Sequence, residues 1–190
     1  IGEYKLPFTV QVQTEEVKSA GRKVASLEEF LHIAKEDFHE AYRIFTERHF
    51  SLILSDQSEK IRSLYAGMSQ QPVTYQHLEE FLIAAGAKEK VTLSLNREEA
   101  GFYDVSESVQ ESLYIHRSGW GHLRADIEVN GDFLEAGKHV VTEEDFIGST
   151  CEINYVIRQE KLGKGNQYGE IIVKTPYQKL VYHVLASRGT

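Results

Sequence analysis

The sequence contains one cysteine, one tryptophan and three prolines in 190 residues. A single cysteine, Cys151, excludes an intrachain disulfide and therefore the disulfide framework of small secreted domains. No stretch approaches the ~20 consecutive apolar residues that a membrane-spanning helix requires, so we expect no membrane span. These absences leave the cellular compartment open.

Positive charge is also scarce, since 21 Lys and Arg stand against 29 Asp and Glu and give a formal net charge of -8. Such a chain is repelled by a polyanion, and no basic run compensates, so we expect no nucleic-acid partner. Apolar residues make up 41% of the chain, and nine Phe and ten Tyr provide large side chains for a core. The composition therefore predicts a folded globular protein.

The N-terminal stretch Tyr4–Gln13 alternates apolar and polar residues, and Pro7 within it removes one backbone donor, which predicts an edge strand. One strand cannot bury its apolar face alone, so it is either the last strand of a truncated upstream domain, which we favour, or a strand that docks on the later sheet. Its unpaired edge could also recruit a second copy of the chain. The start at Ile1, without methionine, indicates a piece of a longer protein. Thr14–Ala25 is small and polar and predicts a linker, so residues 1–25 form a strand plus linker.

Apolar residues spaced by three and four then predict helices. The first runs from Ser26 to about His49, and Ser26 with Glu29 can form a capping box at its start. Two shorter helices are predicted over Ser58–Gly67 and Tyr75–Ala85, each ended by a glycine.

Beyond residue 90 the apolar period changes from helical to two, most clearly where the tryptophan precedes a strictly alternating run. Seven strands are predicted: Val91–Leu95, Val109–His116, His122–Val129, Lys138–Val141, Cys151–Arg158, Tyr168–Lys174 and Lys179–Ala186. Seven short strands with turn residues between them are typical of a sandwich. The predicted fold is therefore α+β, with a small N-terminal helical subdomain (26–89) followed by an antiparallel immunoglobulin-like β-sandwich (90–190).

Residues that could carry catalysis or hold a metal have simpler structural explanations. The eight histidines include no pair at the helical i, i+4 spacing of zinc motifs, so we expect no metal site and no cofactor. The carboxylates of Glu143–Asp145 could serve acid/base chemistry at a glycosidic bond, but they follow Thr142 in a helical turn, where the helix dipole stabilises them. Cys151 shares the phase of a buried strand face. We expect no catalytic residue and no enzyme activity in this fragment alone.

Four aromatic residues could bind a small ligand: Trp120, Tyr103, Tyr168 and Tyr177. Flat apolar faces suit sugar rings, so an exposed set would predict a carbohydrate site. The alternative is packing, because Trp120 precedes an amphipathic strand and sandwich cores commonly bury a tryptophan. Exposure of the rings decides between the two.

Short motifs are spread along the chain at Tyr4–Val10, Leu27–Phe30, Arg117–Gly121, Asp145–Phe146 and Gly165 with Gly169–Ile171. Through them the chain resembles a family of large uncharacterised bacterial proteins of unknown function. The resemblance implies immunoglobulin-like modules along a longer chain, neighbouring domains as partners, and the bacterial cytoplasm or cell surface as location. It transfers no catalytic residue. We expect a non-catalytic structural or interaction module or, alternatively, a carbohydrate-binding or accessory domain of a glycan-processing enzyme.

Overall fold

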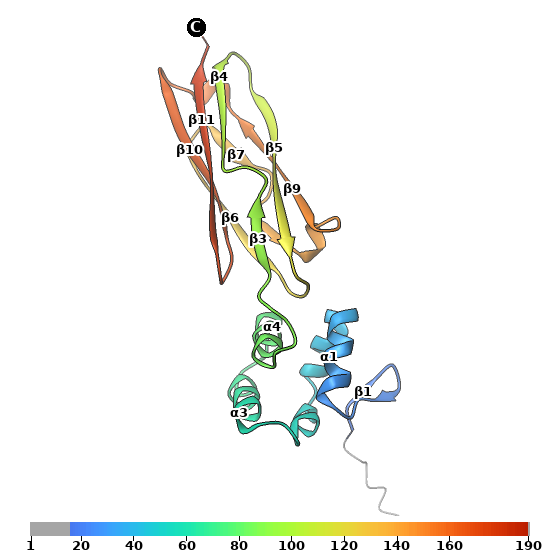
Figure 1. Ribbon diagram of the computed structural model, residues 1–190. Coiled ribbons are helices and arrows are strands. Elements are labelled where there is room, and N and C mark those ends of the chain that lie inside the picture. The colour runs from blue at the N-terminus through green and yellow to red at the C-terminus, as the bar shows by residue number, and fades with distance from the viewer. Residues whose placement is uncertain (1–15, 190) are drawn as a thin grey trace, which may run out of the picture. The chain divides into compact units, whose positions relative to one another are not determined.

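The computed structural model describes residues 16–189 and shows a mixed α+β chain (Figure 1). Its contacts divide into two compact units between Ala84 and Ala85. The α-helices lie in the first unit, and two larger β-sheets form the second. The strand predicted at Tyr4–Gln13 lies outside the described residues.

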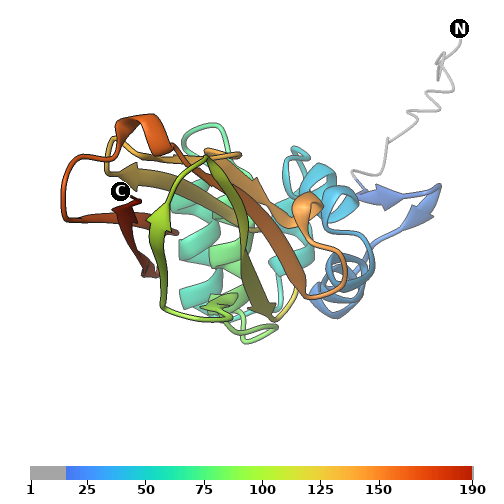
Figure 2. The ribbon, with the colours of Figure 1, turned by 90° about the horizontal axis from the view of Figure 1, so that it is seen from above.

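Within the described residues, the first element of the first unit is a hairpin of two short strands, visible as the two blue arrows in Figure 2. Its elements are β1 (Lys18–Ser19), β2 (Arg22–Lys23), α1 (Leu27–Glu36), α2 (Phe38–Phe45), the 3-10 helix η1 (Phe50–Leu54), α3 (Glu59–Met68) and α4 (Tyr75–Ala84). The linker predicted over this hairpin is therefore wrong in part. The turn residues Ala20 and Gly21 have φ angles of 50° and 78°, the left-handed pair that closes a tight two-residue turn.

Side-chain caps mark the N-termini of α1 and α2. The Ser26 Oγ accepts a hydrogen bond from the Glu29 amide at 3.2 Å, while the Glu29 carboxylate accepts from the Ala25 amide, as the predicted capping box requires. The single helix predicted from Ser26 to His49 is wrong. Asp37 takes an extended conformation (φ -146°), and its carboxylate caps α2 by accepting from the Glu40 amide at 3.1 Å.

Aromatic side chains form the core of the first unit. Phe30, Phe45, Phe50 and Phe81 are each at most 1% exposed. The Phe50 ring meets the rings of Phe30 and Phe45 edge-on, with centroids 4.8 and 5.2 Å apart, a favourable arrangement of aromatic quadrupoles. The helical stripes read from the sequence therefore converge on one aromatic cluster.

The second unit has nine strands in its described residues, together with two 3-10 turns. These are β3 (Thr92–Leu95), β4 (Glu99–Val105), β5 (Val109–Ser118), β6 (Arg124–Asn130), β7 (Leu134–Ala136), β8 (Val140–Thr142), η2 (Glu143–Asp145), β9 (Thr150–Ile157), η3 (Gln159–Lys161), β10 (Asn166–Lys174) and β11 (Lys179–Arg188). One sheet has the order β4-β11-β10-β6-β8 and the other β3-β5-β9-β7.

Strands β4 and β7 were not predicted. β7 has only three residues. β4 alternates in burial over its first five residues, but its outward positions hold Gly101 and Tyr103, so the sequence shows little contrast between apolar and polar residues there. The prediction of a wholly antiparallel arrangement is wrong at one pair, since β4 runs parallel to β11. The chain passes from β3 to β4 without reversing direction (Figure 1), which places β4 alongside the last strand of the other sheet. The register of this pair shifts between Ala186 and Arg188, and Asp104 beside it has φ 54°.

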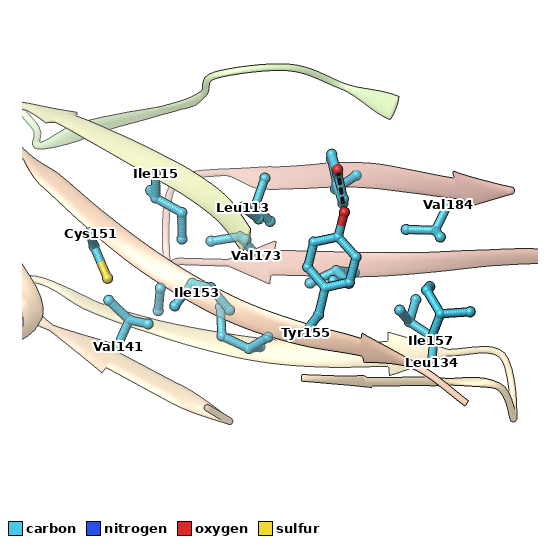
Figure 3. Packing of buried hydrophobic residues seen from close by; sticks show 14 of the residues in the cluster. Leu113, Ile115, Leu134, Val141, Cys151, Ile153, Tyr155, Ile157, Val173 and Val184 are labelled. Carbon is cyan, nitrogen blue, oxygen red and sulfur yellow. Dashed lines mark hydrogen bonds between the residues drawn. The ribbon is translucent and has the colours of Figure 1, made fainter. Parts of the chain in front are cut away.

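The two larger sheets share one buried core. Along β9, the alternate residues Cys151, Ile153, Tyr155 and Ile157 are each at most 1% exposed, as a period of two requires. The prediction that Cys151 is a core residue is therefore confirmed. Figure 3 shows these side chains pointing toward the opposite sheet, where Val173 and Val184 belong to the same cluster.

A hydrogen bond between two buried tyrosines joins the sheets. The hydroxyl oxygens of Tyr155 and Tyr182 lie 2.9 Å apart, and both residues are fully buried (dashed line in Figure 3). Burial, followed by the contact with Tyr182, raises the pKa of Tyr155 well above its usual value, so the group stays neutral. Each hydroxyl satisfies the other in a core that otherwise offers few polar partners.

We expect Tyr155→Phe to lower the free energy of unfolding by about 0.5 to 1.5 kcal/mol, because the buried hydrogen bond between the Tyr155 and Tyr182 hydroxyls is lost. The double variant with Tyr182→Phe should cost less than the sum of the two single changes. Urea unfolding followed by fluorescence of the sole tryptophan, Trp120, measures both, with Tyr114→Phe at an exposed position as control. Strictly additive single changes would contradict the coupling.

Candidate functional site

A groove of about 830 Å³ lies on the outer face of the five-stranded sheet. It is bounded by β4, β11 and β10, with the end of β6 beside them. Its side chains belong to two rows that run across neighbouring strands, one apolar and one polar. The rows follow from the strand register, because residues paired across adjacent strands lie on the same face.

The apolar row runs from Gly101 on β4 through Leu185 on β11 to Tyr168 on β10. The Tyr103 ring lies over Gly101, since a Cβ built on that glycine would stand 3.0 Å from both the ring carbon Cε2 and the hydroxyl oxygen of Tyr103. Glycine therefore makes room for the ring to fold back onto the strand. Tyr103 and Tyr168 are 64% and 76% exposed, so the groove presents two tyrosine rings to solvent.

The polar row runs from Glu99 through His183 and Glu170 to Asn130, one residue on each of β4, β11, β10 and β6. The Asn130 side-chain amide donates to the Glu170 carboxylate at 3.0 Å. Adjacent strands are about 4.8 Å apart, which places Glu99 and Glu170 roughly 10 Å apart with His183 between them. This row supplies hydrogen-bond donors and acceptors beside the two rings.

Arg97, in the connection between β3 and β4, also lines the groove. The nearby Tyr182 hydroxyl raises the pKa of Arg97 above its usual value. The exposed guanidinium therefore lies close to one member of the buried tyrosine pair.

The other two aromatic candidates lie away from this groove. Trp120 is half-buried in the loop between β5 and β6, outside the buried cluster, and Lys88 places its ammonium 5.0 Å from the ring centroid. Tyr177 lies in the turn between β10 and β11, where Lys90 approaches its ring at 4.8 Å. Both rings make cation–π contacts within the second unit. The structure therefore brings together Tyr103 and Tyr168 but neither Trp120 nor Tyr177.

Two carboxylates of the acidic cluster Glu143–Asp145 accept hydrogen bonds from backbone amides. The Asp145 carboxylate accepts from the Thr142 amide at 2.8 Å and pairs with the ammonium of Lys138, whose hydrogen bond lowers the pKa of Asp145. The Glu143 carboxylate accepts from the Leu123 amide at 3.2 Å. These bonds hold η2 against neighbouring strands, as a capped turn does.

Residues 16–189 contain neither a metal-binding cluster nor a membrane-spanning helix. No three or more His, Cys, Asp or Glu side chains are grouped so that they could hold a metal ion. In the same residues, no helix has both the length and the apolar character needed to cross a bilayer.

The polar row was missed by sequence reasoning. Its members are far apart in the chain, and each is an ordinary polar residue on the outward phase of a strand. The only local signal was the outward phase of Glu170 and His183, which does not show which residues are neighbours.

One family model matches the whole sequence. A family model described as "Family of unknown function (DUF5717) N-terminal" matches residues 1–190. The chain belongs to this family. The predicted resemblance to an uncharacterised family is thus confirmed, and the DUF5717 description attaches no activity to it. No curated protein matches the chain.

Solved structures resemble only parts of the DUF5717 chain. WR4, an MSP family member of C. elegans, has 5% identity and a TM-score of 0.35, and the match covers 50% of this chain and 96% of WR4. A family 123 glycoside hydrolase from Clostridium perfringens has 6% identity and a TM-score of 0.39, over 53% of this chain and 27% of the enzyme. The Vibrio cholerae protease VesB has 8% identity and a TM-score of 0.33, over 50% and 31%. Scores this low carry no argument about fold or function.

We expect Gly101→Ala to displace the Tyr103 ring, because the new methyl group would occupy the position of its edge. The ring is the end of a flexible side chain, so the free energy of unfolding should change by less than about 1 kcal/mol. NMR chemical shifts of the Tyr103 ring protons measure the displacement. Gly163→Ala, whose methyl group would meet only the Gln167 side chain at 3.4 Å, is the control. Unchanged Tyr103 shifts would show that the ring does not rest on Gly101.

Proposed function

We propose that this chain is a non-catalytic binding module of a larger bacterial protein and that its groove binds carbohydrate. The observation that carries the proposal is the meeting of two exposed tyrosine rings with a row of polar side chains in one groove. Neighbouring domains of the same longer chain are the expected partners of such a module.

An immunoglobulin-like fold of the second unit is part of the proposal. The spatial order β3-β5-β9-β7 resembles strands A, B, E and D of that fold, and β11-β10-β6 resembles G, F and C. Strand β8 lies at the position of C′ beside β6, but it follows β7 along the chain, whereas C′ precedes D in the immunoglobulin fold. In this comparison β4 is a continuation of the first strand that has moved to the opposite sheet. The shared buried core between the two sheets also supports this assignment.

Carbohydrate is the ligand class that best fits the chemistry of the groove. Sugar rings combine flat apolar faces with hydroxyl groups at their edges, so they match a surface that alternates aromatic rings with polar groups. The tyrosines offer the faces, while Glu99, Glu170 and Asn130 offer acceptors and a donor. A few placed polar groups beside apolar surface are the usual composition of a small-molecule site.

The second candidate is an accessory domain of a glycan-processing enzyme. The two groove glutamates favour it, because paired carboxylates are the groups that hydrolyse glycosidic bonds. In that case another part of the longer protein would complete the active site. Hydrolysis assays on the full-length protein, with and without this region, separate an accessory domain from an independent binding module.

We expect Tyr168→Ala and Tyr103→Ala each to weaken glycan binding at least fivefold, about 1 kcal/mol, because each removes one of the two exposed rings. A glycan array identifies a ligand, and calorimetry then gives the dissociation constants. Tyr114→Ala, which removes an exposed tyrosine ring from the four-stranded sheet, is the control. Absence of binding across the array, or equal binding by all variants, would refute the proposed function.

We also propose that two copies of the chain associate through Tyr4–Gln13. The reason is that an unpaired strand edge can add to another sheet and bury its apolar side chains there. We expect light scattering to give a larger mass for residues 1–190 than for residues 14–190 at the same concentration. Two monomers of equal thermal stability would exclude a role for this strand in association.

A further inference from the structure

We propose that the groove prefers glycans that carry free amino groups over neutral or acetylated ones. This inference rests on the proposed carbohydrate function and specifies its ligand. It comes from the order of residues in the polar row, where one carboxylate lies on each side of β11.

The position of the two glutamates follows from the register alone. Glu99 pairs with His183, and His183 pairs with Glu170, so the glutamates occupy the two strands that flank β11. All three residues lie on the groove side of the sheet. A ligand group resting above His183 therefore has one carboxylate within reach on each side, at about one strand spacing, ~4.8 Å.

The Glu170 carboxylate is already oriented before any ligand arrives. The Asn130 amide donates to its Oε1 atom at 3.0 Å, which leaves Oε2 as an acceptor. An ammonium group offers three donors and a positive charge, so its hydrogen bonds to two carboxylates are stronger than those of a hydroxyl group. An acetylated nitrogen offers one donor and no charge.

Arg97, the arginine that lines the groove, lies outside the row that would bind the amino group. The charged groups lining the groove are Glu99, Glu170 and Arg97, with no lysine among the described lining residues. Arg97 lies in the connection before β4 and is not a member of the polar row. The polar row therefore carries two carboxylates and neither lysine nor arginine.

The experiment compares a β-1,4-linked glucosamine hexamer with its fully N-acetylated counterpart by calorimetry on residues 1–190. Glu99→Gln and Glu170→Gln keep the side-chain shape and remove one charge each. Glu128→Gln is the matched control, because Glu128 lies on the outward face of the same sheet but does not line the groove. Measurements at low and high salt test the electrostatic origin.

We expect the free amine to bind more tightly than the acetylated hexamer at low salt. Each glutamine in the groove should weaken amine binding about two- to fivefold, the range for exposed ion pairs, and leave acetylated binding within twofold. Glu128→Gln should change neither, and high salt should reduce the preference.

Three outcomes would overturn the inference. These are equal or tighter binding of the acetylated hexamer, an amine preference that survives both glutamine substitutions, and no binding of either hexamer. None of them refutes carbohydrate binding itself, which the glycan array and the tyrosine variants test independently.

Discussion

The register of β11 is the constraint on which the second unit depends. This strand pairs antiparallel with β10 along its length and parallel with β4, so its alternate residues are assigned at once to the core and to the outer face. Tyr182, Val184 and Ala186 enter the core, while His183 and Leu185 enter the groove. A slip of one residue would bury His183 and expose the Tyr182 ring. Core packing therefore keeps the groove's two rows in place.

The Tyr155–Tyr182 hydrogen bond makes that register more specific. An apolar core accepts side chains of similar volume at several positions, whereas a buried hydroxyl is satisfied only where its partner lies within reach. The bond joins β9 of one sheet to β11 of the other, so it also fixes how the two sheets meet. Arg97, which lines the groove, interacts with the Tyr182 hydroxyl of this pair.

Much of the fold could be predicted because local patterns carry it. Alternation along β6 and β9 and the helical stripe of α4 are visible in the sequence, and Ser26 with Glu29 marks a helix start. Asp37 was missed because apolar spacing continues across it, although its side chain caps a new helix. β4 was missed because Gly101 and Tyr103 occupy its outward positions, so its alternation does not show as a contrast between apolar and polar residues. The candidate site was predictable only in its aromatic members, since the polar row depends on pairing between residues such as Asn130 and Glu170 that are 40 positions apart.

The irregular end of β4 affects how readily another polypeptide can pair with this edge of the sheet. An edge strand offers unpaired amides and carbonyls, and a straight one invites foreign polypeptide to extend the sheet. Here the register shift beside Arg188 and the left-handed backbone of Asp104 break the regular spacing of those groups. The regular part of β4 that another chain could join is therefore short, from Glu99 to Phe102. A short edge of this kind offers fewer backbone groups for sheet extension than a strand that stays regular along its whole length.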